Sequence, residues 1–135
     1  MGEFGLDYYV QTLDRERQQA LFEAQLQLAV DFHLPALLHV RRSHAPVIAA
    51  LKRFRLQRGG IIHAFSGSLE EAREYIKLVL ETDSPDMAPA MFPGMRNSPE
   101  HLPQIAQAHA ELLGITVGEL AQVSSRNACE LFHWA

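Results

Sequence analysis

The sequence has almost no cysteine and no long apolar run, and these absences exclude several protein classes. Its single Cys129 rules out an internal disulfide, and no apolar stretch approaches the roughly 18 residues that a membrane span needs. The first residues do not show the charged and apolar pattern of a secretory signal. We therefore expect a cytoplasmic protein without a membrane segment, with Cys129 as a packed thiol in a C-terminal helix.

Excess basic charge is also missing. The 12 Lys and Arg residues are outnumbered by 16 Asp and Glu residues, which gives a net charge of −4. Proteins built for bulk nucleic-acid binding usually carry the opposite balance. At 135 residues with a hydrophobic fraction of 47%, the chain is long enough for a core of its own, and we expect one domain over residues 1–135.

What is present is an alternation of apolar strands and amphipathic helices. A continuous apolar run at 36–39 is typical of a parallel strand covered on both faces, and Ser68 followed by Glu71 fits a helix capping box. The repeat of strand and helix predicts an α/β fold with parallel pairing. In chain order, the expected elements are strands at 1–4, 36–39 and 61–63 and helices at 13–32, at 43–54 with Ser43 as cap, and from 69 onward.

The alternation breaks after the third helix. The segment 79–81 follows at once, although a connection from helix to strand normally takes about 2–6 residues. Either the helix continues until Pro85 or a strand starts directly from it, and we expect that a piece is missing here. Beyond an irregular loop at 86–97, the pattern predicts helices at 99–113, after Thr116, and from Ser124 or Ser125 to about 132.

Histidines and acids follow the predicted strands. Glu3, His39 and His63 lie at the ends of the three strands, and Asp83 follows the segment 79–81. The carboxyl ends of parallel strands meet at one edge of a sheet, where ligands gather. A mixed set of nitrogen and oxygen donors suits Zn²⁺ or Mn²⁺, and Mg²⁺ where carboxylate and water dominate. We expect these four side chains to converge on a divalent metal that activates water.

Two neighbouring features have two interpretations each. Backbone N–H groups around Ser66 at a helix start can bind an anion or can simply cap the helix. Arg41 and Arg42, directly after His39, can grip a phosphate or form a solvated surface pair.

Five segments together resemble the TatD family of metal-dependent hydrolases and DNases. The resemblance implies a TIM barrel of the metal-dependent hydrolase type, a two-metal phosphodiesterase site and, as substrates, DNA ends or small phosphoesters. The segments are 2–9 (GEFGLDYY), 34–41 (LPALLHVR), 62–68 (IHAFSGS), 80–85 (LETDSP) and 96–99 (RNSP).

The resemblance also implies roles for individual residues. It makes Glu3 a metal-bridging acid, His39 and His63 ligands of one metal, and Asp83 the ligand that also accepts the proton of the attacking water. The residues that it places near the substrate phosphate are Arg41, Ser66, Arg96 and Asn97.

Two departures from the family pattern stand out. The chain has no His-x-His pair, which in the family supplies ligands to the other metal, and no strand lies between the FSGS helix and the ETD motif. Because a full barrel takes about 250 residues, we expect a partial barrel with about half of the strands, truncated at the N-terminus and internally deleted. An incomplete sheet predicts self-association. The alternative is a non-catalytic fragment that retains the scaffold and at most a single-metal site.

Overall fold

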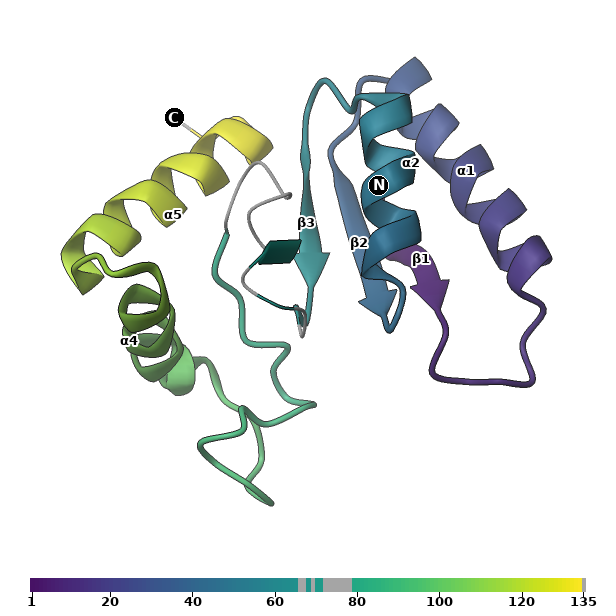
Figure 1. The fold of residues 1–135 in the computed structure, drawn as a ribbon. Helices are drawn as coiled ribbons and strands as arrows, with labels where there is room; N and C mark the ends of the chain where they lie inside the picture. Colours follow the sequence, from purple (N-terminus) through teal and green to yellow (C-terminus); the bar gives the residue numbers. More distant parts are fainter. Residues whose placement is uncertain (66–67, 69, 72–78, 135) are drawn as a thin grey trace. The chain divides into compact units, whose positions relative to one another are not determined.

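The computed structural model describes residues 1–65, 68, 70–71 and 79–134 (Figure 1). The chain divides into two compact units, Met1–Lys77 and Leu78–Ala135. The expectation of one domain over residues 1–135 stays a prediction.

The first unit is a parallel sheet with helices in its connections. Its strands lie in the order β1-β2-β3, and both neighbouring pairs are parallel. This confirms the predicted α/β fold. The elements in chain order are β1 (Phe4–Asp7), α1 (Arg15–Asp31), β2 (Ala36–Arg41), α2 (His44–Phe54) and β3 (Gly60–His63).

One face of this sheet carries the core. Helices α1 and α2 lie on the same side of the strands (Figure 1), and Phe22 of α1 packs its ring 5.9 Å from that of Phe4 on β1. Burying such aromatic and aliphatic side chains is the main source of stability. The buried cluster consists of Phe4, Leu6, Phe22, Leu26, Ala36, Leu38, Val40, Val47 and Ala50.

The strand β2 alternates in exposure, so the prediction of a strand covered on both faces is wrong. Leu38 is 1% exposed, whereas its neighbour Leu37 is 36% exposed. His39 is half-buried and Arg41 is exposed on that same open face. The alternation is not visible in the sequence, because Leu37 is apolar although its side chain lies on the face of the sheet opposite α1 and α2 (Figure 1).

The first strand begins and ends later than predicted, and the second ends later. β1 begins at Phe4, so Glu3 precedes it and Asp7 ends it, while β2 continues two residues beyond His39. Gly5 makes this pairing possible: a Cβ at that position would lie 1.8 Å from the carbonyl oxygen of His39. A glycine that looked like the start of a loop is therefore a strand residue at a close backbone approach.

Ser43 precedes α2 as predicted but does not cap it through its side chain. The buried Ser43 hydroxyl donates instead to the carbonyl oxygen of Leu6, at 2.6 Å. The predicted capping box at Ser68 is confirmed: its N–H donates to Glu71 Oε2 at 2.8 Å, and the Glu71 N–H donates to Ser68 Oγ at 3.2 Å.

The second unit contains a 3-10 turn, η1 (Pro99–His101), followed by α4 (Leu102–Leu113) and α5 (Val117–Phe132). Gly114 ends α4 in the left-handed region, with φ of 68°, as a C-terminal glycine should. Thr116 caps α5 through a capping box with Glu119.

The two short helices predicted after Thr116 are one continuous helix. Ser124 does not cap a new helix: it is buried inside α5, and its hydroxyl accepts the N–H of Leu80 at 3.0 Å. The segment 79–83 forms neither of the structures considered for it, since it is neither helix nor strand.

Cys129 is an exposed thiol, so the expectation of a packed thiol is wrong. It lies nine residues after Leu120, which is 1% exposed. Nine steps of about 100° each place the two side chains on opposite faces of a helix. The apolar neighbours of Cys129 in the sequence therefore do not bring it into the core.

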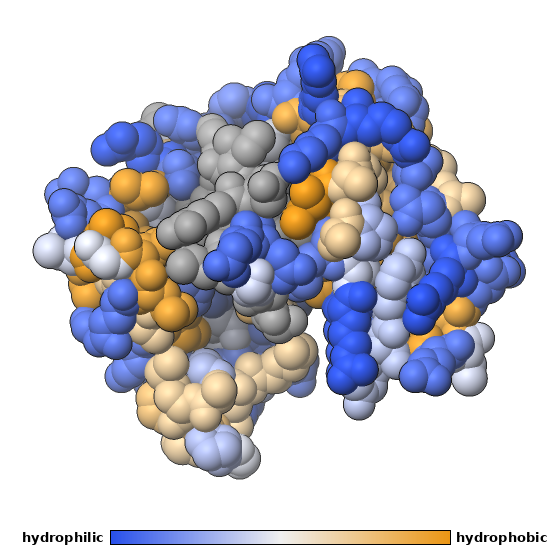
Figure 2. Space-filling view, viewed as in Figure 1, coloured by the Kyte–Doolittle hydropathy of each residue, from blue (hydrophilic) through white to orange (hydrophobic). Residues whose placement is uncertain are grey.

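Apolar side chains remain on the surface where α4 and α5 meet (Figure 2). Leu112 is 68% exposed, and Ile115 is 38% exposed. Self-association of the chain stays a prediction. No helix in the described part of the chain is long and apolar enough to cross a membrane.

Candidate metal centre

The sheet gathers acids and histidines on its open face. In the parallel register, Gly5 lies opposite His39 and Asp7 opposite Arg41 on one side of β2, while His39 lies opposite His63 on the other. Paired positions of neighbouring strands point to the same face, and the strands are about 4.8 Å apart. This register puts His39 and His63 on the same face of the sheet, and the expectation that they bind one metal stays a prediction.

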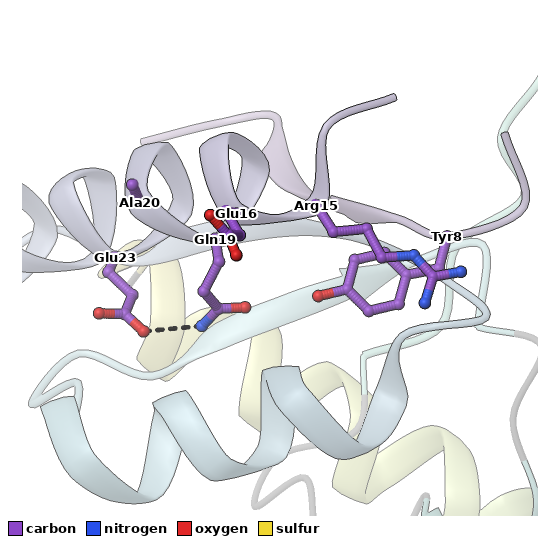
Figure 3. A pocket seen from close by; sticks show the side chains of 6 residues that line it. All are labelled: Tyr8, Arg15, Glu16, Gln19, Ala20 and Glu23. Carbon is purple, nitrogen blue, oxygen red and sulfur yellow. Dashed lines mark hydrogen bonds between the residues drawn. The ribbon is translucent and has the colours of Figure 1, made fainter. Parts of the chain in front are cut away.

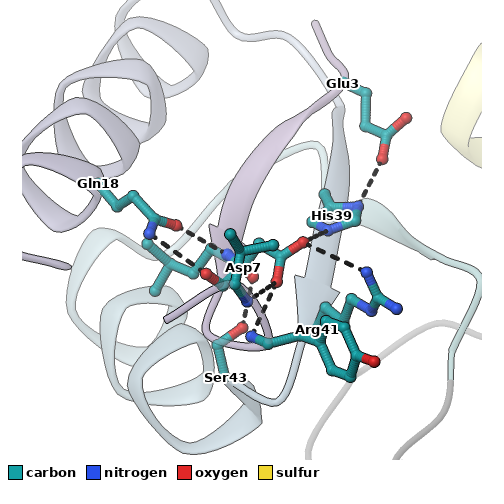
Figure 4. A network of polar contacts seen from close by, with 9 residues as sticks. Glu3, Asp7, Gln18, His39, Arg41 and Ser43 are labelled. Carbon is teal, nitrogen blue, oxygen red and sulfur yellow. Dashed lines mark hydrogen bonds and ion pairs between the residues drawn. The ribbon is translucent and has the colours of Figure 1, made fainter. Parts of the chain in front are cut away.

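The His39 ring lies between two carboxylates (Figure 4). Its Nδ1 is 3.1 Å from Glu3 Oε1, and its Nε2 is 3.4 Å from Asp7 Oδ2. The two ring nitrogens face opposite directions, so Glu3 and Asp7 cannot bind one ion together with His39. In keeping with this, no three His, Cys, Asp or Glu side chains of the described residues form a metal-binding group.

Asp7 is held firmly in place. Its Oδ1 accepts the N–H groups of Tyr9, at 2.9 Å, and of Val10, at 3.4 Å. Gln18 of α1 fixes the backbone on both sides: its Oε1 accepts the Asp7 N–H at 2.9 Å, and its Nε2 donates to the Asp7 carbonyl oxygen at 3.2 Å. This carboxylate has one oxygen committed to the turn after β1 and the other directed at His39.

These contacts change the acidity of Asp7. Burial on its own would raise the pKa of the carboxyl group. The N–H of Tyr9, the hydrogen bond from His39 and the N–H of Val10 outweigh burial and lower the pKa of Asp7 below its ordinary value. Asp7 is therefore a carboxylate at neutral pH.

Sequence reasoning missed Asp7 as a member of this site, although a usable signal was present. Side chains along a strand alternate between faces with a period of two. Glu3, Gly5 and Asp7 alternate in this way, and a glycine between two acids allows the close approach of the His39 backbone. The predicted strand ended at residue 4, which put Glu3 at a strand end and left Asp7 beyond it.

Arg41, which was expected near the substrate phosphate, already contacts two neighbours. Its guanidinium carbon lies 3.8 Å from the centroid of the Tyr9 ring, and its Nη1 lies 3.8 Å from Asp7 Oδ2. Arg42 lies 4.9 Å from the same ring. The side chain of Arg41 is 50% exposed, so its remaining N–H groups are accessible.

The other predicted residues belong to the second unit, except Ser66, which lies outside the described residues. Asp83 is half-buried with φ of 57°, a conformation that Asp tolerates, and its N–H donates to Glu81 Oε2 at 3.0 Å. Arg96 is exposed. The roles expected of Asp83 as metal ligand and proton acceptor, and of Ser66, Arg96 and Asn97 near a phosphate, stay predictions.

Asn97 has a structural task of its own. It is 3% exposed, and its amide nitrogen donates to the carbonyl oxygens of Thr82 and Met87. Its Oδ1 lies 3.3 Å from His101 Nδ1. This amide bonds to the chain on both sides of Asp83, which makes it a support for that residue.

A shallow pocket beside α1 contains none of the predicted metal ligands (Figure 3). Gln19 Nε2 donates to Glu23 Oε1 at 2.7 Å within it, and the Arg15 guanidinium carbon lies 4.7 Å from the Tyr8 ring centroid. Two pairs of residues around this pocket already contact each other, so few polar groups remain for a ligand to bind. The residues around it are Tyr8, Arg15, Glu16, Gln19, Ala20 and Glu23.

The model of the TatD related DNase family matches residues 1–79 and 76–133. The chain belongs to the TatD related DNase family. It is similar to the "Uncharacterized metal-dependent hydrolase YjjV" of Escherichia coli, with 34% identity over 98% of this chain and 63% of the relative. It is also similar to the "3'-5' ssDNA/RNA exonuclease TatD" of Erwinia tasmaniensis, with 34% identity over 98% of this chain and 65% of the relative.

The solved structure of the E. coli YjjV protein superposes on this chain with a TM-score of 0.87. The comparison covers 99% of this chain and 63% of that one, at 34% sequence identity. This confirms the predicted fold class, a partial TIM-type α/β barrel of the metal-dependent hydrolase type. The chain spans less than two-thirds of the length of these relatives.

The comparison also supports the predicted internal gap. The alignment with YjjV runs over 163 positions, although this chain has only 135 residues, so at least 28 positions of the alignment have no counterpart here. The two matches to the family meet at residues 76–79, the point where the sequence lacks room for a turn and a strand.

Proposed function

We propose that this TatD-family chain is a divalent-metal-dependent hydrolase of phosphodiester bonds, with single-stranded nucleic-acid ends or small phosphoesters as substrates. The observation that carries the proposal is the contact of Glu3 Oε1 with His39 Nδ1 at 3.1 Å, beside His63 in register. The printed names of its relatives, a metal-dependent hydrolase and an exonuclease, point to the same chemistry. We place this activity in the cytoplasm, where an exposed thiol such as Cys129 stays reduced.

The donor set fits a divalent cation. Glu3 offers a carboxylate, and His39 and His63 offer imidazoles on neighbouring strands, a combination that suits Zn²⁺ and Mn²⁺ and also allows Mg²⁺. In the proposal these three residues and Asp83 hold the ion. When bound, the ion supplies a water of lowered pKa and polarises the phosphoryl oxygen.

The remaining residues have roles around the reacting phosphate. Asp83 accepts the proton of the attacking water. Arg41, with accessible N–H groups at its 50% exposed side chain, binds a non-bridging phosphate oxygen, together with Arg96. In this scheme Ser66 donates its N–H to the same phosphate, and Asn97 holds the loop of Asp83.

The absence of a His-x-His pair favours a second candidate, a fragment with one metal at most and no catalysis. Two-metal sites stabilise both the attacking and the leaving oxygen. With one ion, we expect slow hydrolysis of an activated aryl phosphodiester and little or no cleavage of DNA. The two candidates therefore differ in a measurable rate.

Metal binding is tested first, by calorimetric titration with Mn²⁺ and Zn²⁺ and by thermal unfolding. Metal at about 100 times its Kd should stabilise the folded chain by about 2.7 kcal/mol. His39→Asn should remove this stabilisation, whereas His33→Asn, at an exposed histidine with φ of 51° that asparagine tolerates, should keep it. Equal stabilisation of both variants would show that the ion binds elsewhere.

Activity is tested with an aryl phosphodiester and with a 3'-labelled single-stranded oligonucleotide. Asp83→Asn should abolish the metal-dependent rate, because an amide cannot accept the proton of the water. Asp86→Asn, at an exposed position three residues away, is the matched control and should retain the rate. Cleavage that survives Asp83→Asn would assign the chemistry to other residues, and metal binding without any turnover would favour the non-catalytic fragment.

A further inference from the structure

We propose that Asp7 is a positioning residue that fixes the tautomer of His39 and so decides which ring nitrogen is available to a metal. In this assignment the proton sits on Nε2 and points to Asp7, while Nδ1 carries the lone pair and faces Glu3. The importance of this for metal binding rests on the proposed function, but the tautomer itself belongs to the metal-free chain and can be measured there.

The number of protons on the His39 ring limits its hydrogen bonds. A neutral imidazole has one N–H donor and one acceptor nitrogen. Both His39 nitrogens lie beside a carboxylate, with Glu3 at 3.1 Å and Asp7 at 3.4 Å. Since a carboxylate only accepts, just one of the two contacts can be a hydrogen bond in the neutral ring. Glu3, at 3.1 Å, is the nearer acceptor, so the proton is assigned to Asp7 because of its rigidity and not because of its distance.

Asp7 is the more rigid of the two acceptors. Its side chain is 22% exposed, against 39% for Glu3. It lies within β1, its backbone is held by Gln18 on both sides, and its second oxygen accepts two backbone N–H groups. Glu3 precedes the strand and has a longer side chain. Asp7 therefore holds the Nε2 proton, and Glu3 can share an ion with Nδ1.

Asp7→Asn replaces the acceptor that faces His39 Nε2 by a donor and keeps the shape of the side chain. The amide oxygen can continue to accept from the N–H groups of Tyr9 and Val10, so the turn after β1 is kept. The amide NH₂ then occupies the position of Oδ2 and faces Nε2 as a donor. The Nε2 atom must accept, the proton moves to Nδ1, and the nitrogen beside Glu3 loses its lone pair.

The measurement is the ¹⁵N chemical shift of the His39 ring nitrogens in the metal-free protein at pH 9, where histidine rings are neutral. Loss of signals in His39→Asn assigns the ring among the seven histidines. The wild-type chain should show the Nε2–H tautomer and Asp7→Asn the Nδ1–H tautomer. In a separate titration, Asp7→Asn should bind Mn²⁺ and Zn²⁺ about 10- to 100-fold more weakly, the usual effect of losing such a partner.

Asp14→Asn is the matched control, because Asp14 also accepts a backbone N–H, that of Arg17 at 3.0 Å, at the start of α1. It removes the same charge and should leave the His39 tautomer and the metal affinity unchanged. A merely structural role for Asp7 would lower the melting temperature without moving the proton. Glu3→Gln should keep the Nε2–H tautomer, since its amide can donate to Nδ1.

Several outcomes overturn the proposal: an Nδ1–H tautomer in the wild type, an unchanged tautomer in folded Asp7→Asn, or a switched tautomer in Glu3→Gln. If Asp7→Asn does not fold by circular dichroism, the wild type and Glu3→Gln still decide the question. Failure of the wild type to bind metal would contradict the proposed function, while the tautomer measurement would still judge the role of Asp7.

Discussion

Substituting Gly5 by alanine should disturb both the sheet and the candidate metal centre. The added Cβ would lie 1.8 Å from the carbonyl oxygen of His39 and 2.9 Å from its nitrogen, whereas Cβ contacts below 3.0 Å essentially do not occur. The strand β1 must therefore move away from β2 by about 1.2 Å. Overpacking of this kind costs about 1–3 kcal/mol, and a weakened ladder hydrogen bond adds about 1 kcal/mol. We expect the free energy of unfolding to fall by about 2–4 kcal/mol.

The assay is urea unfolding followed by circular dichroism, with Gly118→Ala as the control. Gly118 lies in α5, and a Cβ there meets nothing closer than 3.9 Å. Alanine should stabilise that helix by about 0.5–1 kcal/mol. In Gly5→Ala, metal affinity should fall as well, since Glu3 moves with the strand. A loss of stability below about 0.5 kcal/mol in Gly5→Ala would refute the close approach of the two strands as the reason for this glycine.

Three further predictions concern the first unit. Phe22→Ala removes a ring that is 0% exposed and should lower the free energy of unfolding by about 3–5 kcal/mol. Phe32→Ala, at a side chain that is 69% exposed, should change it by no more than about 0.5 kcal/mol in the same assay. Ser43→Ala leaves the buried carbonyl oxygen of Leu6 without its 2.6 Å donor and should cost about 1–3 kcal/mol; an unchanged unfolding midpoint would contradict that role. The fold lowers the pKa of Asp7, so the Asp7 carboxylate stabilises the folded chain fully above the ordinary carboxyl pKa near 4 and loses this effect as pH falls through the lower folded-state pKa. The difference in unfolding free energy between wild type and Asp7→Asn should therefore shrink from pH 7 to pH 3. A constant difference would contradict this linkage.

The sequence was sufficient for the order and type of the elements in the first unit, because apolar periodicity and parallel connections are local patterns. It also placed His39 and His63 on neighbouring strands, which the register of β2 and β3 agrees with. It failed where a long-range contact decides the structure. The extension of β1 to Asp7 depends on a backbone approach between Gly5 and His39. The spacing of Glu3, Gly5 and Asp7 indicates a strand, but the local sequence does not show which backbone approaches Gly5.

The second unit shows the same limit. Ser124 has the residue type of a helix cap, yet it is buried in α5 because its hydroxyl accepts the N–H of Leu80 from 44 residues away. The segment 79–81 seemed to require a helix or a strand, but this contact holds it in an irregular path. Residue preference suggested one structure in each case, and a tertiary hydrogen bond selected another.

Every second residue of β2 is buried, and this alternation affects which of its positions tolerate substitution. Ala36, Leu38 and Val40 are constrained by packing, while His39 and Arg41 lie outside the core and contact polar or aromatic neighbours such as Asp7. Within a single six-residue strand, selection on folding and selection on chemistry therefore act on different positions. A library randomised at 37, 39 and 41 should yield folded variants at high frequency, so that new ligand preferences can arise here without loss of the scaffold.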